Sequence, residues 1–353
     1  MLSKKSFLSR CKRLQHIASQ LPHTRTMALA KIEALVRLNM GWEAIQLDRN
    51  LTSPPFELAH RLVEQAICEL NICRQIAFCD GGLPVSTSTT FVDGEAEHHD
   101  LFQALWIEFS ASAYTERIER YDQRLAFNKL NSGFFNDMQI IDMGCGHGNF
   151  AHALLNAGAK FVLGIDFGEQ TIAYAQAAQI RLKIPSSQLS FSVASVYAVP
   201  QPDGIFDAAV QNGVFHHLAH EDRAYQEMFR LLKPGGWAWI YTEGAGSIAR
   251  ELWDISVEIL ADIPASLVQE HLKHLGFSIN KRYHLGDGLK AVYHATTYEN
   301  LTQRLTKMGF GEFRRLVGGF ETDLDITAAD PWAAEKFGEG DIRLLARKLK
   351  TRA

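Results

Sequence analysis

The sequence predicts an α/β fold in which a mostly parallel sheet is flanked by helices. Three observations carry this prediction. Short apolar segments alternate with helical patterns through the middle of the chain, a glycine-rich loop follows the first of these segments, and an acidic residue ends the second. Alternation at this spacing is typical of parallel strands joined by helices. Ligands of such sheets bind at the carboxyl ends of the strands, where the loop and the acid would lie.

Seven segments are predicted as strands because each is a short apolar run between helical patterns or turns. In chain order they are residues 138–142, 160–166, 189–196, 206–211, 236–242, 313–317 and 342–346. The helices that alternate with them are predicted at residues 150–156, 169–182, 223–232 and 298–308. The alternation stops after the fifth strand. Residues 247–297 are therefore an insertion, with helices predicted at 248–263 and 267–275 and an irregular stretch after them.

Helical patterns also fill most of the N-terminal part of the chain. Residues 28–79 carry apolar positions at three- and four-residue steps, and Ser53-Pro54-Pro55 interrupts them. Residues 80–97 are rich in glycine, serine and threonine, which predicts a linker. Residues 100–131 follow as a predicted helix with many aromatic side chains.

Composition and charge exclude several classes of protein. The 353 residues include 36 basic and 40 acidic side chains, for a net charge of −4, and 46% are hydrophobic. These values are close to the average for a globular protein and argue against general disorder. The isoelectric point near 6.4 argues against a nucleic-acid binder. No apolar run approaches the roughly 20 residues of a membrane helix.

The N-terminus and the cysteines bear on the compartment. Seven basic residues and no acid precede Glu33, which fits a transit peptide, a solvated basic helix or a flexible arm. No apolar segment of a secretory signal is present, and we expect a cytoplasmic protein. The five cysteines lack the spacing of a metal site. Those at positions 11, 68, 73 and 79 are expected to be buried free thiols in a reducing compartment.

The most informative segment is Asp142-Met143-Gly144-Cys145-Gly146-His147-Gly148, at the end of the first predicted strand. Its glycines allow the backbone to approach a ligand closely. Asp166 ends the next strand, 24 residues after Asp142, and its carboxylate can accept hydrogen bonds from both hydroxyls of a ribose. A purely structural alternative is that Asp142 caps the following helix. We expect His147 to face solvent.

This loop and the later acid resemble the first two motifs of the class I S-adenosylmethionine (SAM)-dependent methyltransferases. Residues 205–218 resemble the motif at the fourth strand of that family, and residues 231–236 the turn before its fifth strand. The resemblance covers residues 138–246, with weaker agreement over 298–348. It implies a Rossmann-like, seven-stranded, mostly parallel sheet and SAM as the cofactor.

The resemblance also implies which residues contact SAM. Asp142 and the glycine loop would hold its amino-acid end, Asp166 its ribose, and Asn212 would lie under its methionine chain. Phe167 and Ser195 would line the adenine pocket, although many relatives carry an acid where Ser195 stands. The implied contacts are Asp142, Met143, Gly144, Cys145, Gly146, Asn149, Phe150, Asp166, Phe167, Ser195, Val196, Asn212, Gly213 and Val214.

Three residues are candidates for catalysis. His216 and His217 follow the fourth strand, near the expected position of the methyl group, and either could serve as a general base or simply pack in the core. Glu243 ends the fifth strand, beside the same edge, and is expected to contact substrate. His216 and His220 have a spacing that can bind zinc, but no third ligand is evident, so no metal is predicted.

The fourth-strand motif bears on the acceptor. Its Asn212-Gly213-Val214-Phe215 differs from the Asn/Asp-Pro-Pro-aromatic element of enzymes that methylate base amino groups. We therefore predict methyl transfer to a small molecule, such as a natural-product or sugar-like scaffold. The alternatives are a methyltransferase for protein or RNA and a non-catalytic SAM-binding module. Acceptor contacts are predicted at Tyr114, Tyr121, Tyr283, His284 and His294, each of which could instead be a core or surface residue.

These predictions divide the chain into four parts. Residues 1–99 are a helical N-terminal extension, and residues 100–246 are the SAM-binding core with its leading aromatic helix. Residues 247–297 are a helical lid insert, and residues 298–353 complete the core. The predicted partner is the small-molecule acceptor, without nucleic acid or a membrane span. The oligomeric state is left open, a homodimer being one option.

Overall fold

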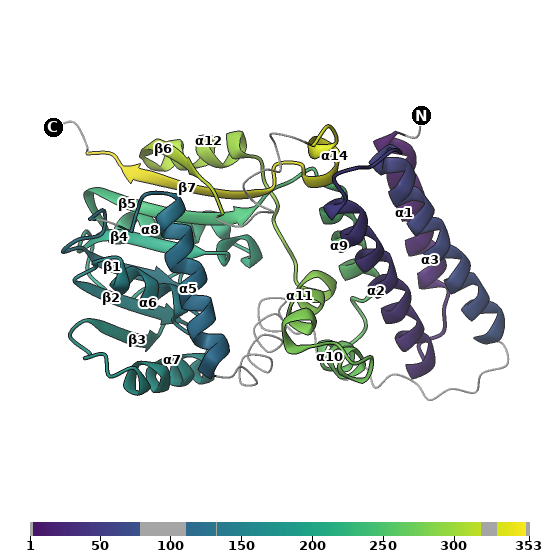
Figure 1. Cartoon of the computed structure of the whole chain (residues 1–353), viewed down its shortest axis with the longest axis horizontal. Coiled ribbons are helices and arrows are strands. Elements are labelled where there is room, and N and C mark those ends of the chain that lie inside the picture. The colour runs from purple at the N-terminus through teal and green to yellow at the C-terminus, as the bar shows by residue number, and fades with distance from the viewer. Residues whose placement is uncertain (1–2, 78–110, 132, 319–329, 351–353) are drawn as a thin grey trace. The chain divides into compact units, whose positions relative to one another are not determined.

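The structure, a computed structural model, describes residues 3–77, 111–131, 133–318 and 330–350. The predicted linker at 80–97, Cys79 and the first part of the predicted aromatic helix lie outside the described residues. The chain forms two compact units (Figure 1). One, the helical unit, takes residues from Met1–Phe102, Ala245–Tyr293 and Ile326–Gly338. The other, the sheet unit, takes residues from Gln103–Gly244, His294–Asp325 and Glu339–Ala353.

The sheet unit is built on seven strands in the order β3-β2-β1-β4-β5-β7-β6 (Figure 1). The strands are β1 Gln139–Met143, β2 Phe161–Asp166, β3 Leu189–Val193, β4 Phe206–Asn212, β5 Leu232–Glu243, β6 Phe310–Leu316 and β7 Asp341–Lys348. The pairs among β1 to β5 are parallel, and β7 runs antiparallel to both β5 and β6. The predicted fold class is confirmed. The strand order reverses between β1 and β4, where sheets of this kind place their ligands.

Side chains alternate across each strand and form one core on each face of the sheet. Ile140 and Val162 pack with one layer of helices, whereas Ile141 and Leu163 pack with the other. The first layer contains α5 Ala111–Phe127, α6 Asn149–Asn156 and α7 Glu169–Arg181. The second contains α8 Glu221–Leu231 and α12 Tyr298–Met308. Both faces are covered, so the loops at the strand ends are left to carry the site.

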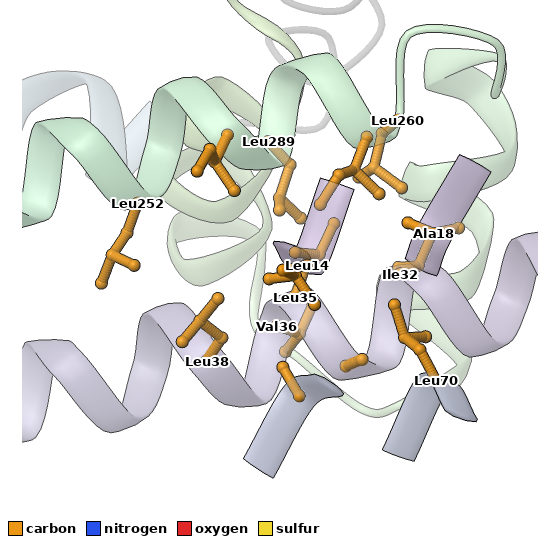
Figure 2. Packing of buried hydrophobic residues seen from close by; sticks show 14 of the residues in the cluster. Leu14, Ala18, Ile32, Leu35, Val36, Leu38, Leu70, Leu252, Leu260 and Leu289 are labelled. Carbon is orange, nitrogen blue, oxygen red and sulfur yellow. The ribbon is translucent and has the colours of Figure 1, made fainter. Parts of the chain in front are cut away.

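The helical unit joins segments that are far apart in the sequence. Its helices are α1 Lys4–Ser19, α2 Arg25–Leu47, α3 Pro55–Ala77, α9 Ile248–Ile259, α10 Ala265–His274, α11 Ile279–Lys290 and α14 Ala333–Phe337. Leu14, Leu35 and Leu252 come from three of them and meet in one apolar core (Figure 2). The predicted extension and the predicted insert therefore share a core. That the insert acts as a lid stays a prediction.

The residues after α10 differ from the prediction of an irregular stretch, because α11 lies there. Its start is capped by Ser278, whose hydroxyl accepts a hydrogen bond from the backbone N–H of Lys281. Gly286 and Gly288 lower the helical propensity of the segment and hide the pattern. Gly288 is required by packing, since a Cβ there would lie 2.4 Å from the Trp253 ring.

The N-terminal helix α1 is amphipathic. Phe7, Cys11 and Leu14 are buried in the core of the helical unit, whereas Lys5 and Lys12 are exposed. Its exposed basic side chains fit the predicted solvated basic helix. None of the helices that the structure describes combines the length and the apolar character that crossing a membrane requires.

The cysteines follow the prediction only in part. Cys11 is buried, and burial raises the pKa of its thiol to about 12. Cys68 is exposed on α3, so the prediction that it is buried was wrong, and Cys73 is half-buried. Cys68 lies away from the apolar stripe of α3, whereas Cys73 packs against the core of the helical unit, so helix period rather than residue type decides their burial.

Candidate functional site

The glycine loop between β1 and α6 is fixed by backbone geometry. Gly144, Gly146 and Gly148 have φ angles of +80°, +51° and +81°, which favour glycine. A Cβ at Gly144 would lie 2.6 Å from a methyl carbon of Val214. The backbone N–H groups of Gly144 and Cys145 both donate to the carbonyl of Ile165, at 2.8 Å, which ties the loop to the end of β2.

Asp142 lies at the carboxyl end of β1 and is 1% exposed. Its Oδ2 has no hydrogen-bond partner among the described residues. Burial, and then repulsion from Asp166, raise the pKa of this carboxyl to about 8. A buried carboxylate without a cation is costly, so the site is electrostatically suited to a positively charged group. The helix-cap alternative for Asp142 also has support, because its carboxylate accepts a hydrogen bond from the backbone N–H of Ala151 in the first turn of α6, while Oδ2 stays without a partner.

Asp166 ends β2 and faces the same loop. Its Oδ2 accepts a hydrogen bond from the backbone N–H of Gly146, and its Oδ1 accepts one from Gly168, both at 3.0 Å. These two backbone donors hold the carboxylate in one orientation beside the loop. Phe167 follows with 53% of its surface exposed.

Two side chains of the glycine loop point into the protein. The Cys145 thiol is buried beside β2, and a Cβ on Gly164 would lie 3.0 Å from its sulfur. Burial raises the pKa of this thiol well above its usual value, so it is not a reactive thiolate. The prediction that His147 faces solvent was wrong. Its ring is buried against Tyr174, 4.3 Å between centroids, and burial lowers its pKa to about 3.

Helix α5 supports the loop through Tyr114. The Tyr114 hydroxyl donates to the carbonyl of His147 at 3.0 Å and lies 2.8 Å from Nδ1 of His152. The Asn149 side chain donates back to the carbonyl of Tyr114 at 3.1 Å. Tyr114 is 2% exposed. We therefore assign Tyr114 to the support of the glycine loop rather than to acceptor binding, and Asn149 contributes to the same support.

The turn after β4 is organised by Gln211, which the sequence analysis did not single out. Its Oε1 accepts hydrogen bonds from the backbone N–H groups of Val214 and Phe215, at 3.1 and 3.3 Å. Its Nε2 donates to the carbonyl of Tyr241 on β5 at 2.9 Å. The one signal in the sequence is a polar residue that follows the apolar run 208–210, directly before the predicted cofactor contacts.

Asn212 joins the turn after β4 to α5. Its Nδ2 donates to the Tyr121 hydroxyl at 3.4 Å, and its buried Oδ1 has no partner among the described residues. Tyr121 packs against Phe150 at the start of α6, with 5.0 Å between ring centroids. Asn212, which was predicted to contact the cofactor, thus lies beside Tyr121, which was predicted to contact the acceptor.

The three predicted catalytic residues also converge. His216 is 2% exposed, and its Nδ1 lies 2.9 Å from the backbone nitrogen of Glu243. The Nε2 atoms of His216 and His217 are 3.0 Å apart. The backbone N–H of His294 donates to the carbonyl of His216 at 2.7 Å, which places the exposed His294 beside the pair. Beside Glu243 on the same strand, Tyr241 packs under the Arg343 guanidinium at 4.3 Å, and burial raises the pKa of its phenol.

The remaining predicted residues are placed as follows. Met143 points into the core behind β1, which leaves its backbone for a ligand. The Ser195 hydroxyl accepts a hydrogen bond from the backbone N–H of Tyr197 at 3.2 Å, and Val196 next to it is buried. Tyr283 and His284 belong to α11 of the helical unit. Within the described part of the chain, no three His, Cys, Asp or Glu side chains converge as metal ligands would.

Comparison with known proteins shows which families this chain resembles. The profile of the methyltransferase domain family matches residues 141–240. The chain is 28% identical to a mitochondrial ubiquinone biosynthesis O-methyltransferase of Mus musculus, over 63% of this chain and 64% of that protein. It is 26% identical to the sterol 24-C-methyltransferase erg6 of Aspergillus fumigatus, over 59% of this chain and 60% of that protein. It therefore spans less than two thirds of the length of these relatives.

Solved structures give a more distant likeness. A Burkholderia thailandensis 1,6-didemethyltoxoflavin-N1-methyltransferase, determined with 1,6-didemethyltoxoflavin and S-adenosylhomocysteine bound, superposes with a TM-score of 0.43 and 16% identity. The match covers 74% of this chain and 93% of that one. This structural likeness is too distant to indicate a function. The function is inferred from the site instead.

Proposed function

We propose that this chain, which belongs to the class I SAM-dependent methyltransferases through its domain at residues 141–240, transfers a methyl group to a small-molecule acceptor. The observation that carries the proposal is the pairing of two acids around a glycine loop. Asp142 is buried with an oxygen that has no partner among the described residues, and Asp166 is oriented beside the same loop by two backbone donors. Such a pair suits a ligand with a positive charge at one end and a diol next to it.

The residues present fit SAM, the cofactor of this family. Asp142 would hold its amino-acid end, where the ammonium group supplies the missing cation. Asp166 would hold its ribose, and the exposed Phe167 ring would lie beside its adenine. Val196 would line the adenine pocket. Gly144 adopts a left-handed backbone conformation and packs so closely against Val214 that no side chain fits there, which brings the loop against the turn after β4.

When bound, SAM supplies an electrophilic methyl group whose leaving group is a neutral thioether. The protein therefore has to align an acceptor with that methyl group and keep water away. We propose that Asn212, Tyr121 and the histidine pair do so, since Asn212 contacts Tyr121 at the end of β4 and the histidines follow that strand. Glu243 is proposed as an acceptor contact on the same edge.

The proposed acceptor is a small molecule. The names of two relatives, a ubiquinone biosynthesis O-methyltransferase and a sterol 24-C-methyltransferase, both refer to small organic molecules. The net charge of −4 and the absence of a base-methylation motif support the same class. A natural-product or sugar-like acceptor, a cytoplasmic location and acceptor roles for Tyr283, His284 and His294 remain proposals.

Calorimetric titration with SAM and with S-adenosylhomocysteine tests the proposed function. We expect the wild-type chain to bind both, and Asp166→Ala to bind them about 10- to 100-fold more weakly, because hydrogen bonds to a charged group are lost. Asp137→Asn is a matched control. Asp137 is an exposed carboxyl just before β1 with a φ of +59°, which Asn tolerates. If the folded wild-type chain binds neither compound, the proposal is wrong.

A further inference from the structure

The helical unit has a polar cluster of its own around Arg250, whose side chain is buried. The other members of this Arg250 cluster are Asp254, Asp287 and Tyr293. Arg250 and Asp254 belong to α9, Asp287 belongs to α11, and Tyr293 follows α11. All four come from residues 247–297, the predicted insert. None of them is among the predicted contacts of SAM or of the acceptor, so the cluster requires an explanation of its own.

The guanidinium of Arg250 is held in place but is not fully satisfied. Its Cζ lies 4.4 Å from the centroid of the Tyr293 ring, a cation–π contact. Its Nε forms an ion pair with Oδ1 of Asp254 at 2.9 Å. The backbone N–H of Arg250 donates to the hydroxyl of Ser247, the residue that caps α9, also at 2.9 Å. Nη2 of Arg250 is buried and has no hydrogen-bond partner among the described residues. The cluster therefore keeps a donor that the described protein does not use.

Asp287 presents an acceptor in the same cluster. Its Oδ2 accepts a hydrogen bond from the Tyr293 hydroxyl at 2.6 Å, whereas its buried Oδ1 has no partner among the described residues. Burial raises the pKa of this carboxyl to about 6, against the lowering effects of that hydrogen bond and of the Arg250 charge. The carboxyl is thus mainly ionised at neutral pH. Tyr293 links the two side chains, since its ring contacts Arg250 and its hydroxyl binds Asp287.

The charges of the cluster decide which group can satisfy both atoms. Unpaired buried donors and acceptors are costly, so a ligand that pairs with both is favoured. A carboxylate or phosphate would be repelled by Asp254 and Asp287, whose two negative charges exceed the one positive charge of Arg250. An ammonium would be repelled by the guanidinium and has no lone pair for Nη2. A hydroxyl is neutral, and it has both an O–H donor and free lone pairs.

We propose that the Arg250 cluster binds a hydroxyl group of a small molecule, which accepts a hydrogen bond from Nη2 of Arg250 and donates one to Oδ1 of Asp287. This inference goes beyond the proposed function and does not depend on it, because every residue of the cluster belongs to the helical unit. Two sources can supply such a hydroxyl. One is the methyl acceptor itself, and the other is a separate small molecule that binds the helical unit alone.

Phenol and anisole test the proposed hydrogen bonds without SAM. The two probes differ by one methyl group on oxygen, so phenol both donates and accepts, whereas anisole only accepts. The full chain, labelled with ¹⁵N-arginine, is titrated with each probe. The Nε–H resonance of Arg250, identified by its loss in Arg250→Lys, reports binding. We expect phenol to bind about 10-fold more tightly than anisole, because anisole cannot donate to the charged carboxylate. Benzoate should bind more weakly than phenol.

Three results with the wild-type chain would overturn the proposal. Equal affinity for phenol and anisole would show that the ring drives binding and that no hydroxyl is recognised. Tighter binding of benzoate would indicate an anion site. If no probe shifts the resonance, water satisfies the two buried atoms and the cluster is not a ligand site. These comparisons need no variant of Asp287, so they do not depend on how well such a variant folds.

Asp287→Asn should abolish the preference for phenol. If the Tyr293 hydroxyl keeps donating to the amide oxygen, the amide nitrogen takes the place of Oδ1, where it can only donate. Phenol should then bind about 10-fold more weakly than to wild type, while the affinity for anisole should change little. Asp262→Asn is the matched control, because Asp262 is another acid of the helical unit and pairs with His23 at 2.8 Å. Thermal unfolding identifies the folded variants. An unchanged preference in folded Asp287→Asn would contradict the role of Oδ1.

Adding SAM distinguishes the two sources of the hydroxyl. If the site holds the methyl acceptor, phenol is methylated, and Asp287→Asn raises the KM for phenol about 10-fold with little change in kcat. If phenol binds but is not methylated, or if its KM is unchanged in the variant, the site holds a separate small molecule. Both results support the binding site and identify its ligand. A failure of the chain to bind SAM would refute the proposed function alone, because the titrations with phenol and anisole contain no SAM.

Discussion

Two buried polar side chains, one in each unit of this chain, differ in whether the protein satisfies them. In the helical unit, Asn39 is buried on α2, and its side chain donates to the hydroxyl of Ser256 and to the carbonyl of Leu35, both at 2.9 Å. In the sheet unit, Asp142 is equally buried, yet its Oδ2 has no partner. A satisfied polar group fastens helices together, whereas an unsatisfied acid is a cost that only a ligand removes. Unpartnered buried atoms also occur in the helical unit, where Oδ1 of Asp287 is one, so what distinguishes Asp142 is its place beside the glycine loop.

If the helical unit contributes stability and the sheet unit binds SAM, stability and cofactor binding can be changed separately. Leu252→Ala removes a fully buried side chain where α9 meets the other helices of the helical unit. We expect the free energy of unfolding of the unit to fall by about 2–5 kcal/mol, from lost burial and the cavity that remains. Below the unfolding transition, SAM affinity should stay within about twofold of wild type. Denaturant unfolding and calorimetry measure the two quantities.

The control for this prediction is Leu275→Ala, which truncates a leucine that is 44% exposed just after α10. It should lower the free energy of unfolding by less than about 1 kcal/mol. A large loss of SAM affinity in Leu252→Ala under conditions where the chain is folded would contradict the separation of the two roles.

Asp142→Asn should do the reverse of Leu252→Ala, weakening SAM binding without destabilising the chain. We expect SAM affinity to fall about 100-fold, because the partner of the ligand's positive charge is lost. The ligand-free chain should become more stable at alkaline pH, since a buried and repelled carboxylate has been removed. Calorimetry and denaturant unfolding of both proteins across pH 4 to 9 give the measurement, with Asp137→Asn as the exposed control.

The pH dependence has a definite sign. Folding raises the pKa of Asp142 from 3.8 to about 8, so the folded state binds a proton that the unfolded state releases between these values. The contribution of Asp142 to stability is therefore complete below about pH 4 and is lost as the pH rises through 8. SAM binding should release a proton near neutral pH. A pH-independent stability difference between wild type and Asp142→Asn would show that the carboxyl is not perturbed.

The sequence alone was enough to predict those parts of the site that depend on a local pattern of residues. The glycine loop and Asp166 could be placed at neighbouring strand ends because parallel strands align their carboxyl ends. The roles of Gln211 and Tyr114 could not be predicted, because each depends on a partner in another element, the carbonyl of Tyr241 for one and that of His147 for the other. Helix α11 was missed because two glycines that its packing requires weaken its helical pattern.

Gln211 offers a smaller and sharper test of the comparison. Gln211→Leu leaves the backbone N–H groups of Val214 and Phe215 without their acceptor, which should cost about 1–3 kcal/mol and weaken SAM binding. Gln179→Leu is the matched control, because Gln179 on α7 is also buried and donates to the carbonyls of Ile184 and Leu189. Both variants should lose similar stability in denaturant unfolding. Only Gln211→Leu should change the affinity measured by calorimetry.

The smallest effect is expected for a variant of Tyr114, the residue of α5 that supports the glycine loop. Tyr114→Phe keeps the buried ring but removes the hydroxyl that donates to the carbonyl of His147. The loss of one buried hydrogen bond should lower the free energy of unfolding by about 1 kcal/mol. Because that carbonyl belongs to the glycine loop, SAM affinity should fall a few-fold with it. Tyr298→Phe on α12, on the other face of the sheet, should leave SAM affinity unchanged. If Tyr114→Phe also leaves it unchanged, α5 supports the fold of the sheet unit but not the shape of its loop.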